Sequence, residues 1–194
     1  MACSLPKVLI LGHSFVKRLS RDIVSGYYQR LDGSFGLVGT AAVRLAGVGG
    51  RTVDKLRRFD LSVISSYKPD VVILEIGTND LFNDAPEVVG SAIEDLVHLL
   101  FGYASVRVIG WCCVIPRAVS HADSAFFHQR AIILNNYVRV VLEPIPGVFC
   151  WEHRIFNHPA KDFYLPDGVH LNSSGQYHLF RSYRGAIMKA LSFL

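Results

Sequence analysis

The chain has 194 residues, of which 51% are hydrophobic and 19% are charged. This composition argues against disorder, and the length suits one compact domain that covers residues 1–194. No apolar run approaches the roughly 18 residues that a membrane-spanning helix needs, and the N-terminal run is too short for a secretory signal. The formal net charge of +4 permits attraction to nucleic acid or anionic lipid without demonstrating either.

Five short apolar runs predict buried strands, and helical periodicity appears between them. The strands are expected at residues 8–11, 41–46, 71–76, 106–114 and 148–151, and the clearest helices at residues 14 to about 29 and 123–142. Strands that alternate with helices indicate a doubly wound α/β fold. Residues at the carboxyl ends of its parallel strands then share one edge, which is where ligands bind in such sheets.

Three helix starts carry capping signals. Thr52 is expected to open a short basic helix. Asp84 and Glu87 bracket a capping-box-like start. Ser173 and Gln176 are expected to cap the last helix.

The four cysteines are Cys3, Cys112, Cys113 and Cys150, and none of them forms a C-x-x-C pair. Because successive side chains of a strand point to opposite faces, Cys112 and Cys113 are expected on opposite sides of a sheet. The apolar runs around Cys112 and Cys150 are typical of buried free thiols. Free thiols persist in a reducing compartment, so we predict a cytoplasmic protein.

A serine lies where the first predicted strand gives way to helical periodicity. Nucleophilic acyl transfer needs a serine, a base that takes its proton, an acid that orients the base, and donors for the oxyanion. Ser14 can supply the nucleophile. The alternative is that Ser14 only caps the helix that follows.

A histidine follows an acidic residue closely near the end of the chain. His170 comes three residues after Asp167, so both side chains can reach the same edge of the sheet from one turn. This spacing suits a base and the acid that orients it. The alternatives are an ordinary turn at residues 167–168 and an exposed histidine at the entry to a helix.

Oxyanion donors are predicted at two further strand ends. Gly50 has no side chain, so its backbone N–H can approach a substrate closely. Asn79 can direct its side-chain amide to the same point, and the backbone N–H of Ser14 would be a third donor. The alternatives are a flexible loop at residues 47–50 and an Asx turn at residues 79–80. All these features fall at strand ends of one domain, which favours a catalytic site over unrelated structural roles.

Four motifs in this order resemble the SGNH, or GDSL-type, hydrolases. They are G-H-S at residues 12–14, the glycine-rich segment 47–50, G-T-N-D at residues 77–80 and D-G-V-H at residues 167–170. The resemblance implies a three-layer α/β/α sandwich whose five-stranded parallel sheet has the flavodoxin-like order 2-1-3-4-5. It implies Ser14 as the nucleophile, His170 as the base and Asp167 as the partner of His170. It also implies Gly50 and Asn79 as oxyanion donors.

Two finer similarities refine this assignment. Similarity to esterases of the platelet-activating-factor acetylhydrolase type favours Gly50 over Gly47. Residues 11–19 and 165–172 look closest to the esterase domain in the first open reading frame of LINE-type retrotransposons, which would make the chain part of a longer, RNA-binding protein. The departure from the family pattern is His13, where these hydrolases usually have aspartate. That position is outside the triad, so the change does not predict inactivity.

Competing chemistries lack their motifs. The sequence has no G-x-S-x-G elbow, and the glycine-rich segment lacks the G-K-[ST] ending of a phosphate-binding loop and fits G-x-G-x-x-G poorly. The eight histidines form neither H-E-x-x-H nor a paired His/Cys spacing. We therefore expect no metal and no cofactor.

The sequence thus predicts a serine esterase that releases short acyl groups, chiefly acetyl, from a small ester or lipid substrate. Loops near residues 81–82, 117–127 and 156–165 are expected to form the acyl pocket. An anionic membrane surface and, through the longer protein, RNA are the expected partners.

The alternative is a catalytically vestigial scaffold that binds RNA, lipid or protein. Its support is a set of basic residues, for which a solvated helix face is the competing interpretation. They are Arg51, Lys55, Arg57 and Arg58 in one segment and Lys17, Arg18 and Arg21 in another.

Overall fold

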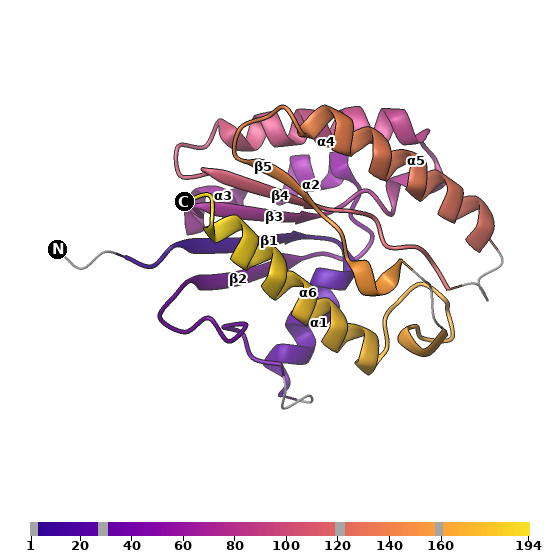
Figure 1. Cartoon of the computed structure of the whole chain (residues 1–194), viewed down its shortest axis with the longest axis horizontal. Coiled ribbons are helices and arrows are strands. Elements are labelled where there is room, and N and C mark those ends of the chain that lie inside the picture. The colour runs from indigo at the N-terminus through magenta and orange to yellow at the C-terminus, as the bar shows by residue number, and fades with distance from the viewer. Residues whose placement is uncertain (1–3, 27–30, 119–122, 158–160) are drawn as a thin grey trace.

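A computed structural model describes residues 4–26, 31–118, 123–157 and 161–194 of the chain (Figure 1). Its five strands are all parallel and form one sheet in the order β2-β1-β3-β4-β5. They are β1 (Lys7–Gly12), β2 (Ala42–Gly47), β3 (Val71–Glu75), β4 (Val108–Cys112) and β5 (Val148–Trp151). The predicted α/β fold, the strand order and all five strands are therefore confirmed.

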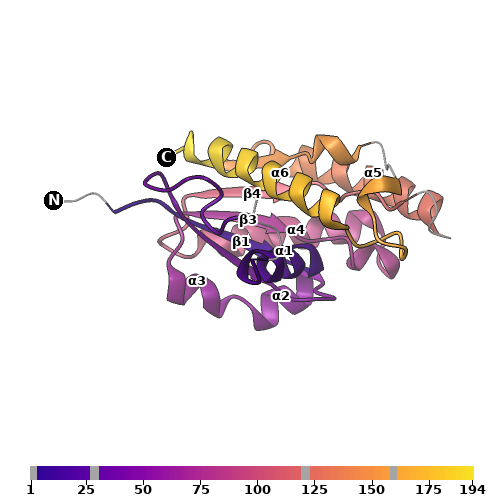
Figure 2. The same ribbon diagram turned by 90° about the horizontal axis from the view of Figure 1, so that it is seen from below.

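In the described part of the chain, six α-helices cover the two faces of this sheet. They are α1 (Ser14–Val24), α2 (Val53–Phe59), α3 (Ser62–Tyr67), α4 (Pro86–Phe101), α5 (Ser124–Leu142) and α6 (Ser173–Leu191). Helices α2 to α5 contribute to one hydrophobic core, and α1 and α6 contribute to the other. Figure 2 shows α6 and the α2–α3 segment on opposite sides of the strands. Among the residues that the structure describes, no helix is long and apolar enough to cross a membrane.

Both faces of the sheet are buried, which explains why its strands are continuous apolar runs. In β1, Leu9 packs in the core beneath α2 to α5, whereas Ile10 packs beneath α1 and α6. Cys112 and Cys113 divide between the two cores in the same way, as predicted. Both thiols are free and buried, Cys150 is free and half-buried, and Cys3 lies outside the described residues.

The predicted capping box of α4 is wrong. The residue that precedes this helix is Ala85, which has an extended backbone and makes no side-chain cap, and Pro86 occupies the first turn. The backbone N–H of Asp84 donates to the carbonyl of Asp80, so Asp84 still belongs to the preceding turn. The fixed φ of proline, rather than a side-chain hydrogen bond, starts the helix.

The last helix is capped one residue earlier than predicted. The Asn172 backbone is extended, and its side-chain oxygen accepts a hydrogen bond from the Gly175 N–H at 3.0 Å. Ser173 is already helical and Gln176 is buried, so neither residue is the cap. Thr52 caps α2 as predicted, accepting from the Lys55 N–H at 3.3 Å. Helix α1 ends at Val24, earlier than predicted, and residues 27–30 lie outside the described part of the chain.

The strand register brings three loops to one edge of the sheet. Gly12, the last residue of β1, lies opposite Gly47 of β2 and Glu75 of β3. A Cβ atom at Gly12 would come within 2.2 Å of the Glu75 carbonyl oxygen, so only glycine fits there. This close approach sets the loops after β1, β2 and β3 side by side.

Candidate active site

All five site residues predicted from the sequence line one cleft of about 720 Å³ at the carboxyl edge of the sheet. They are Ser14, Gly50, Asn79, Asp167 and His170. Four separate loops contribute them, so the fold brings together residues that are up to about 150 positions apart in the chain. The structure thus forms a single site from the predicted set.

Ser14 is the first residue of α1 and is half-buried. The helix cap is His13, whose Nδ1 accepts a hydrogen bond from the Phe15 N–H at 3.4 Å. The alternative interpretation of Ser14 as the cap is therefore wrong. In the described part of the chain, the Ser14 hydroxyl makes no hydrogen bond and lies at the wall of the cleft.

Asp167 and His170 form a close pair within one turn. The His170 Nδ1 lies 2.7 Å from Asp167 Oδ2. Asp167 Oδ1 also accepts the backbone N–H groups of Val169 and His170, at 2.9 and 2.8 Å. The turn is necessary for this arrangement, because Gly168 has a φ of +67°, a conformation that favours glycine. The Asp167–Gly168 turn that the sequence offered as an alternative is thus the element that builds the pair.

The electrostatics of this pair favour an ionised acid. Burial by itself raises the pKa of Asp167, but the hydrogen bonds from the His170 ring and from two backbone N–H groups outweigh burial and hold that pKa at about 2. An ionised Asp167 accepts the Nδ1–H of a neutral His170, which leaves Nε2 able to take a proton. No hydrogen bond joins Ser14 to His170 among the residues that the structure describes.

The two predicted oxyanion donors face the cleft in different ways. Gly50 has a φ of +69°, and a Cβ atom there would meet nothing within 4 Å, so its backbone conformation rather than crowding calls for glycine. The Asn79 Nδ2 donates to the Arg51 carbonyl at 2.8 Å. The Asn79 side-chain oxygen caps no backbone N–H of the following turn, so the Asx turn offered as an alternative is not formed by Asn79. The bond to Arg51 leaves the second amide hydrogen for another acceptor.

Asp80, next to Asn79, is a buried supporting residue that the sequence interpretation missed, and it does not itself line the cleft. Its Oδ1 accepts a hydrogen bond from the Val53 N–H at 2.9 Å, and burial raises its pKa to about 6. Asn79 and Asp80 therefore tie the loop after β3 to the loop that carries Gly50. The sequence feature that could have indicated this role is the position of Asp80, directly after the predicted oxyanion donor Asn79.

One wall of the cleft combines aromatic rings with a guanidinium group. Arg117 is buried, and its guanidinium lies 4.1 Å from the ring centroids of both Phe82 and Phe127. Arg117 and Phe82, from two of the three loops predicted to form an acyl pocket, line the cleft, whereas no described residue of the third loop, 156–165, does. Residues 119–122 and 158–160 of those loops lie outside the described part of the chain.

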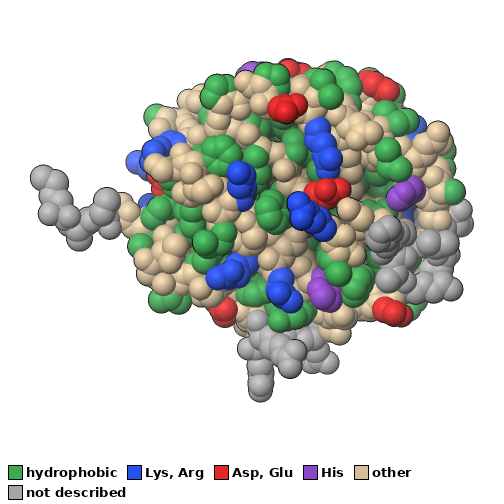
Figure 3. Space-filling view, viewed as in Figure 1, with side chains coloured by type: hydrophobic (Ala, Val, Ile, Leu, Met, Phe, Trp, Pro, Cys, Tyr) green, Lys and Arg blue, Asp and Glu red, His purple; other side chains and the backbone are tan. Residues whose placement is uncertain are grey.

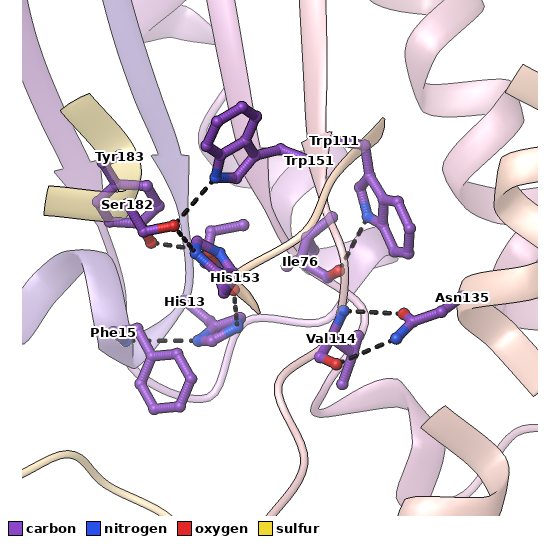
Figure 4. Close-up of polar contacts among 11 residues, drawn as sticks. His13, Phe15, Ile76, Trp111, Val114, Asn135, Trp151, His153, Ser182 and Tyr183 are labelled. Atoms are coloured by element: carbon purple, nitrogen blue, oxygen red, sulfur yellow. Dashed lines mark hydrogen bonds and ion pairs between the residues drawn. The ribbon is translucent and has the colours of Figure 1, made fainter. Parts of the chain in front are cut away.

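A second polar cluster that the sequence interpretation missed adjoins the cleft through His13, and Figure 4 shows its contacts. Its centre is Glu75, which His153 and Tyr183 contact at 3.0 and 2.9 Å. Glu75, Cys112 and His153 each offer one ligand atom within 4.8 Å of the others, a combination that could hold a metal ion. The hydrogen bonds from Tyr183 and His153 give this carboxylate partners without a metal. The expectation that the protein holds no metal remains a prediction. A lone charged residue in an apolar strand was the signal for this cluster.

Comparison with known proteins identifies solved structures with the same fold. No curated protein sequence matches the chain. Three similar crystal structures are an acetyl esterase mutant with an acetate ion (15% identity, TM-score 0.70), a GDSL-like lipase from Bacteroides thetaiotaomicron (16%, 0.72) and a carbohydrate esterase family 3 protein from Talaromyces cellulolyticus (16%, 0.71). In the same order, the alignments include 97%, 97% and 98% of this chain. They include 99%, 93% and 100% of the three other chains. At this level of identity they establish the fold.

The family model gives a more specific result. The model of the GDSL-like lipase/acylhydrolase family matches residues 10–177, which include the end of β1, Ser14 and the turn of Asp167 and His170. With its fold, its cleft and this match in agreement, the chain belongs to the GDSL-like lipase/acylhydrolase family.

Proposed function

We propose that this protein is a serine esterase that hydrolyses short-chain esters, chiefly acetyl esters, through Ser14, His170 and Asp167. The observation that carries the proposal is the single cleft that holds a serine, a histidine–carboxylate pair and two oxyanion donors. Acyl transfer needs these groups together. Membership of an acylhydrolase family makes the same chemistry expected.

In the proposed reaction, Ser14 Oγ attacks the ester carbonyl while His170 Nε2 takes the hydroxyl proton. Asp167 accepts the Nδ1–H of His170 and stabilises the imidazolium that forms. The ring then gives its proton to the leaving alcohol, and a water that it deprotonates hydrolyses the acyl-enzyme. Catalytic hydrogen bonds often shorten only in the substrate complex, so Ser14 and His170 need not be bonded in the free protein.

The oxyanion of the tetrahedral intermediate needs donors that are already in place. The backbone N–H groups of Ser14 and Gly50 and the side-chain amide of Asn79 supply them in this proposal. The bond from Asn79 to the Arg51 carbonyl fixes the direction of that amide before substrate arrives. Such preorganised donors are usually the largest electrostatic contribution to acyl transfer.

Two observations support a small acyl group. An acetyl esterase is among the structural neighbours. Bulky side chains, Phe82 and Arg117, line the cleft next to the pair of Asp167 and His170. A long acyl chain would have to pass these side chains.

The proposed origin is the esterase domain of a LINE-type retrotransposon protein. Its support is the sequence of residues 11–19 and 165–172 around the proposed nucleophile and base. Sequencing the DNA on both sides of the coding region tests this origin. Further retrotransposon reading frames are expected there, and an unrelated gene neighbourhood would contradict it.

The test of the activity is hydrolysis of an ester series from acetyl to octanoyl by the wild type, Ser14→Ala and Ser20→Ala. Ser20 is a half-buried serine of the same helix and serves as the matched control. We expect turnover concentrated on acetyl, lost in Ser14→Ala and retained in Ser20→Ala. Equal background rates in all three folded proteins, with folding checked by circular dichroism, would reject the esterase.

A binding function is the second candidate, because a groove of about 1280 Å³ lies over the edge strand β5. Figure 3 shows basic side chains spread over the face that carries α6 and β5. Arg154, Arg181 and Lys189 line the groove and make no ion pair within the described ranges. The basic segment after β2 supports binding less, because Arg51 pairs with Asp60 and Arg58 pairs with Asp54.

Single-stranded RNA is the probe for this second candidate. Affinity that falls steeply with salt and is lost when Arg154, Arg181 and Lys189 become glutamine would support it. No binding at low salt would reject the nucleic-acid form of the proposal. Ser14→Ala should leave such binding unchanged, which separates the two candidate functions.

A further inference from the structure

In the cluster that adjoins the cleft, one carboxylate is completely removed from solvent. Glu75 ends β3 and is 1% exposed, on the side of the sheet that α1 and α6 cover. Its Oε2 accepts a hydrogen bond from the Tyr183 hydroxyl at 2.9 Å and lies 3.0 Å from His153 Nε2. Its Oε1 lies 3.7 Å from His13 Nε2. The two oxygens therefore face different partners.

This carboxylate is ionised in the folded protein. Burial by itself raises the pKa of Glu75, but His153, His13 and Tyr183 outweigh burial and bring that pKa below its usual value. A carboxylate in this form only accepts hydrogen bonds, so His153 Nε2 carries a proton. The other ring nitrogen of His153 lies 2.8 Å from Ser182 Oγ, which also accepts the Trp151 indole N–H at 3.0 Å. The partners of Glu75 are thus themselves held in place (Figure 4).

The residue that precedes Ser14 contacts Glu75 in two ways. The backbone N–H of His13 donates to the Glu75 carbonyl at 3.2 Å, and its ring Nε2 faces the Glu75 carboxylate. Its Nδ1 accepts the Phe15 N–H, so that nitrogen carries no hydrogen. The ring is therefore a neutral Nε2–H tautomer, and burial lowers its pKa from 6.5 to about 4.

The identity of residue 13 follows from this arrangement. Aspartate is a better cap than histidine in general. An aspartate at position 13, however, would bring a second negative charge next to the buried Glu75. Histidine caps α1 with one nitrogen, and its other nitrogen faces the Glu75 carboxylate at 3.7 Å without adding a negative charge.

We propose that Glu75 is a positioning residue for the nucleophile: its carboxylate, 3.7 Å from His13 Nε2, favours the Nε2–H tautomer electrostatically, and the His13 ring in turn caps the first turn of α1, where Ser14 lies. This inference rests on the proposed esterase function for its catalytic consequence. The contact between Glu75 and His13 can be tested without any activity. Glu75 never touches substrate in this account and acts only through His13.

The first experiment replaces Glu75 by glutamine, with Glu87→Gln as the matched control on the exposed surface of α4. The glutamine oxygen can still accept from His153 and Tyr183, so its NH₂ group must face His13. Because two donors then oppose each other, His13 should change to the Nδ1–H tautomer and lose its hydrogen bond to Phe15. Imidazole ¹⁵N shifts of histidine-labelled protein report the tautomer, and a His13→Asn variant identifies the His13 signals.

The second experiment is a double-mutant cycle in an acetyl-ester assay. His13→Asp should lower kcat by about 10²-fold, as a misplaced reacting group does, and leave KM close to the wild-type value. Glu75→Gln should do the same. The double variant should recover at least about tenfold of kcat, because the new amide can donate to the new carboxylate. Unfolding curves recorded in parallel confirm that every variant is folded at the assay temperature.

The outcomes separate this inference from the esterase proposal. A wild-type His13 in the Nδ1–H form, an unchanged tautomer in Glu75→Gln, or additive losses in the double variant would each overturn it. One equivalent of metal in the purified protein, lost on changing Glu75 or Cys112, would also overturn it. If the wild type hydrolyses no ester, the esterase proposal fails and the positioning of a nucleophile fails with it, whereas the tautomer still decides whether Glu75 controls His13.

Discussion

In the described part of the chain, a histidine–carboxylate pair in the cleft and another in the core differ mainly in their exposure to water. The His170 and Asp167 side chains are 26% and 45% exposed, and their closest atoms are 2.7 Å apart. The His153 and Glu75 side chains are 1% and 2% exposed, at 3.0 Å. The residue types and the contact are nearly the same, so the environment must set the role of each pair.

The exposed pair is accessible to a substrate in the cleft, as proton transfer in the proposed reaction requires, whereas the buried pair is almost completely covered. His170 has a ring nitrogen that faces the cleft, and its turn is formed by neighbouring residues. Both ring nitrogens of His153 are occupied, by Glu75 and Ser182, from distant parts of the chain. The first arrangement suits proton transfer, and the second holds the core in one conformation. The same substitution at the two histidines should therefore have opposite effects.

The largest expected effect is on activity, at the exposed pair. His170→Ala should lower kcat/KM on an acetyl ester by on the order of 10⁴-fold or more, as removal of a triad base does. The free energy of unfolding should fall by about 1 kcal/mol, because the hydrogen bond to Asp167 is lost but is partly exposed to solvent. His98→Ala, on the exposed surface of α4, is the control and should alter neither quantity. Wild-type activity in His170→Ala would remove His170 from the proposed triad.

At the buried pair, the expected effect is on stability. His153→Ala leaves the Glu75 charge without its closest partner, which should reduce the free energy of unfolding by about 3–5 kcal/mol. Urea unfolding of the wild type, His153→Ala and His98→Ala measures this difference. A His153→Ala protein as stable as the control would show that Tyr183 and His13 suffice to compensate the buried charge.

The next largest expected effect is on kcat, at the proposed oxyanion donor Asn79. Asn79→Ala should lower kcat by about 10²–10³-fold, because it removes one preorganised donor. Asn83→Ala is the control, an exposed asparagine in the same loop. An Asn79→Ala protein with the wild-type rate would exclude the Asn79 amide from the oxyanion site.

The exposed region was largely predictable from the sequence, because its residues lie at strand ends and in short motifs. The hydrophobic run that ends before Gly12 placed Ser14, and the Asp167 to His170 spacing predicted a pair that one turn could form. Such signals are local. The parallel sheet brings the predicted residues together because the carboxyl ends of its strands lie at one edge. Local signals failed at two helix starts, where α4 begins at Pro86 without the side-chain cap predicted at Asp84, and α6 is capped by Asn172 rather than by Ser173.

The buried region could not be predicted in this way. Glu75 and His153 are 78 residues apart, and no spacing rule links them. His13 looked like a departure from the family pattern, and its role as a cap depends on where Glu75 points. Only the packing of α6 against the strands brings Tyr183 and Ser182 to this cluster. Tertiary contacts of this kind give no periodic signal in a sequence.

The smallest expected effect is on the free energy of unfolding at acidic pH. It compares the buried His13 with the exposed Asp167. The pKa of His13 is lowered by burial from 6.5 to about 4, so between these values the unfolded chain binds more protons than the folded one. The free energy of unfolding should therefore decrease as the pH falls from 6.5 towards 4, by up to about 3 kcal/mol from this group.

His13→Asn tests this directly, because asparagine also caps a helix and does not titrate. The decrease between pH 6.5 and 4 should be smaller in this variant than in the wild type, as measured by urea unfolding at several pH values. Asp167, with a pKa held at about 2, should lose its contribution only below its ordinary value near 3.8, so Asp167→Asn should follow the wild type between pH 6.5 and 4. Equal pH profiles for the wild type and His13→Asn would mean that the His13 ring gains its proton without cost and that the buried region is open to water.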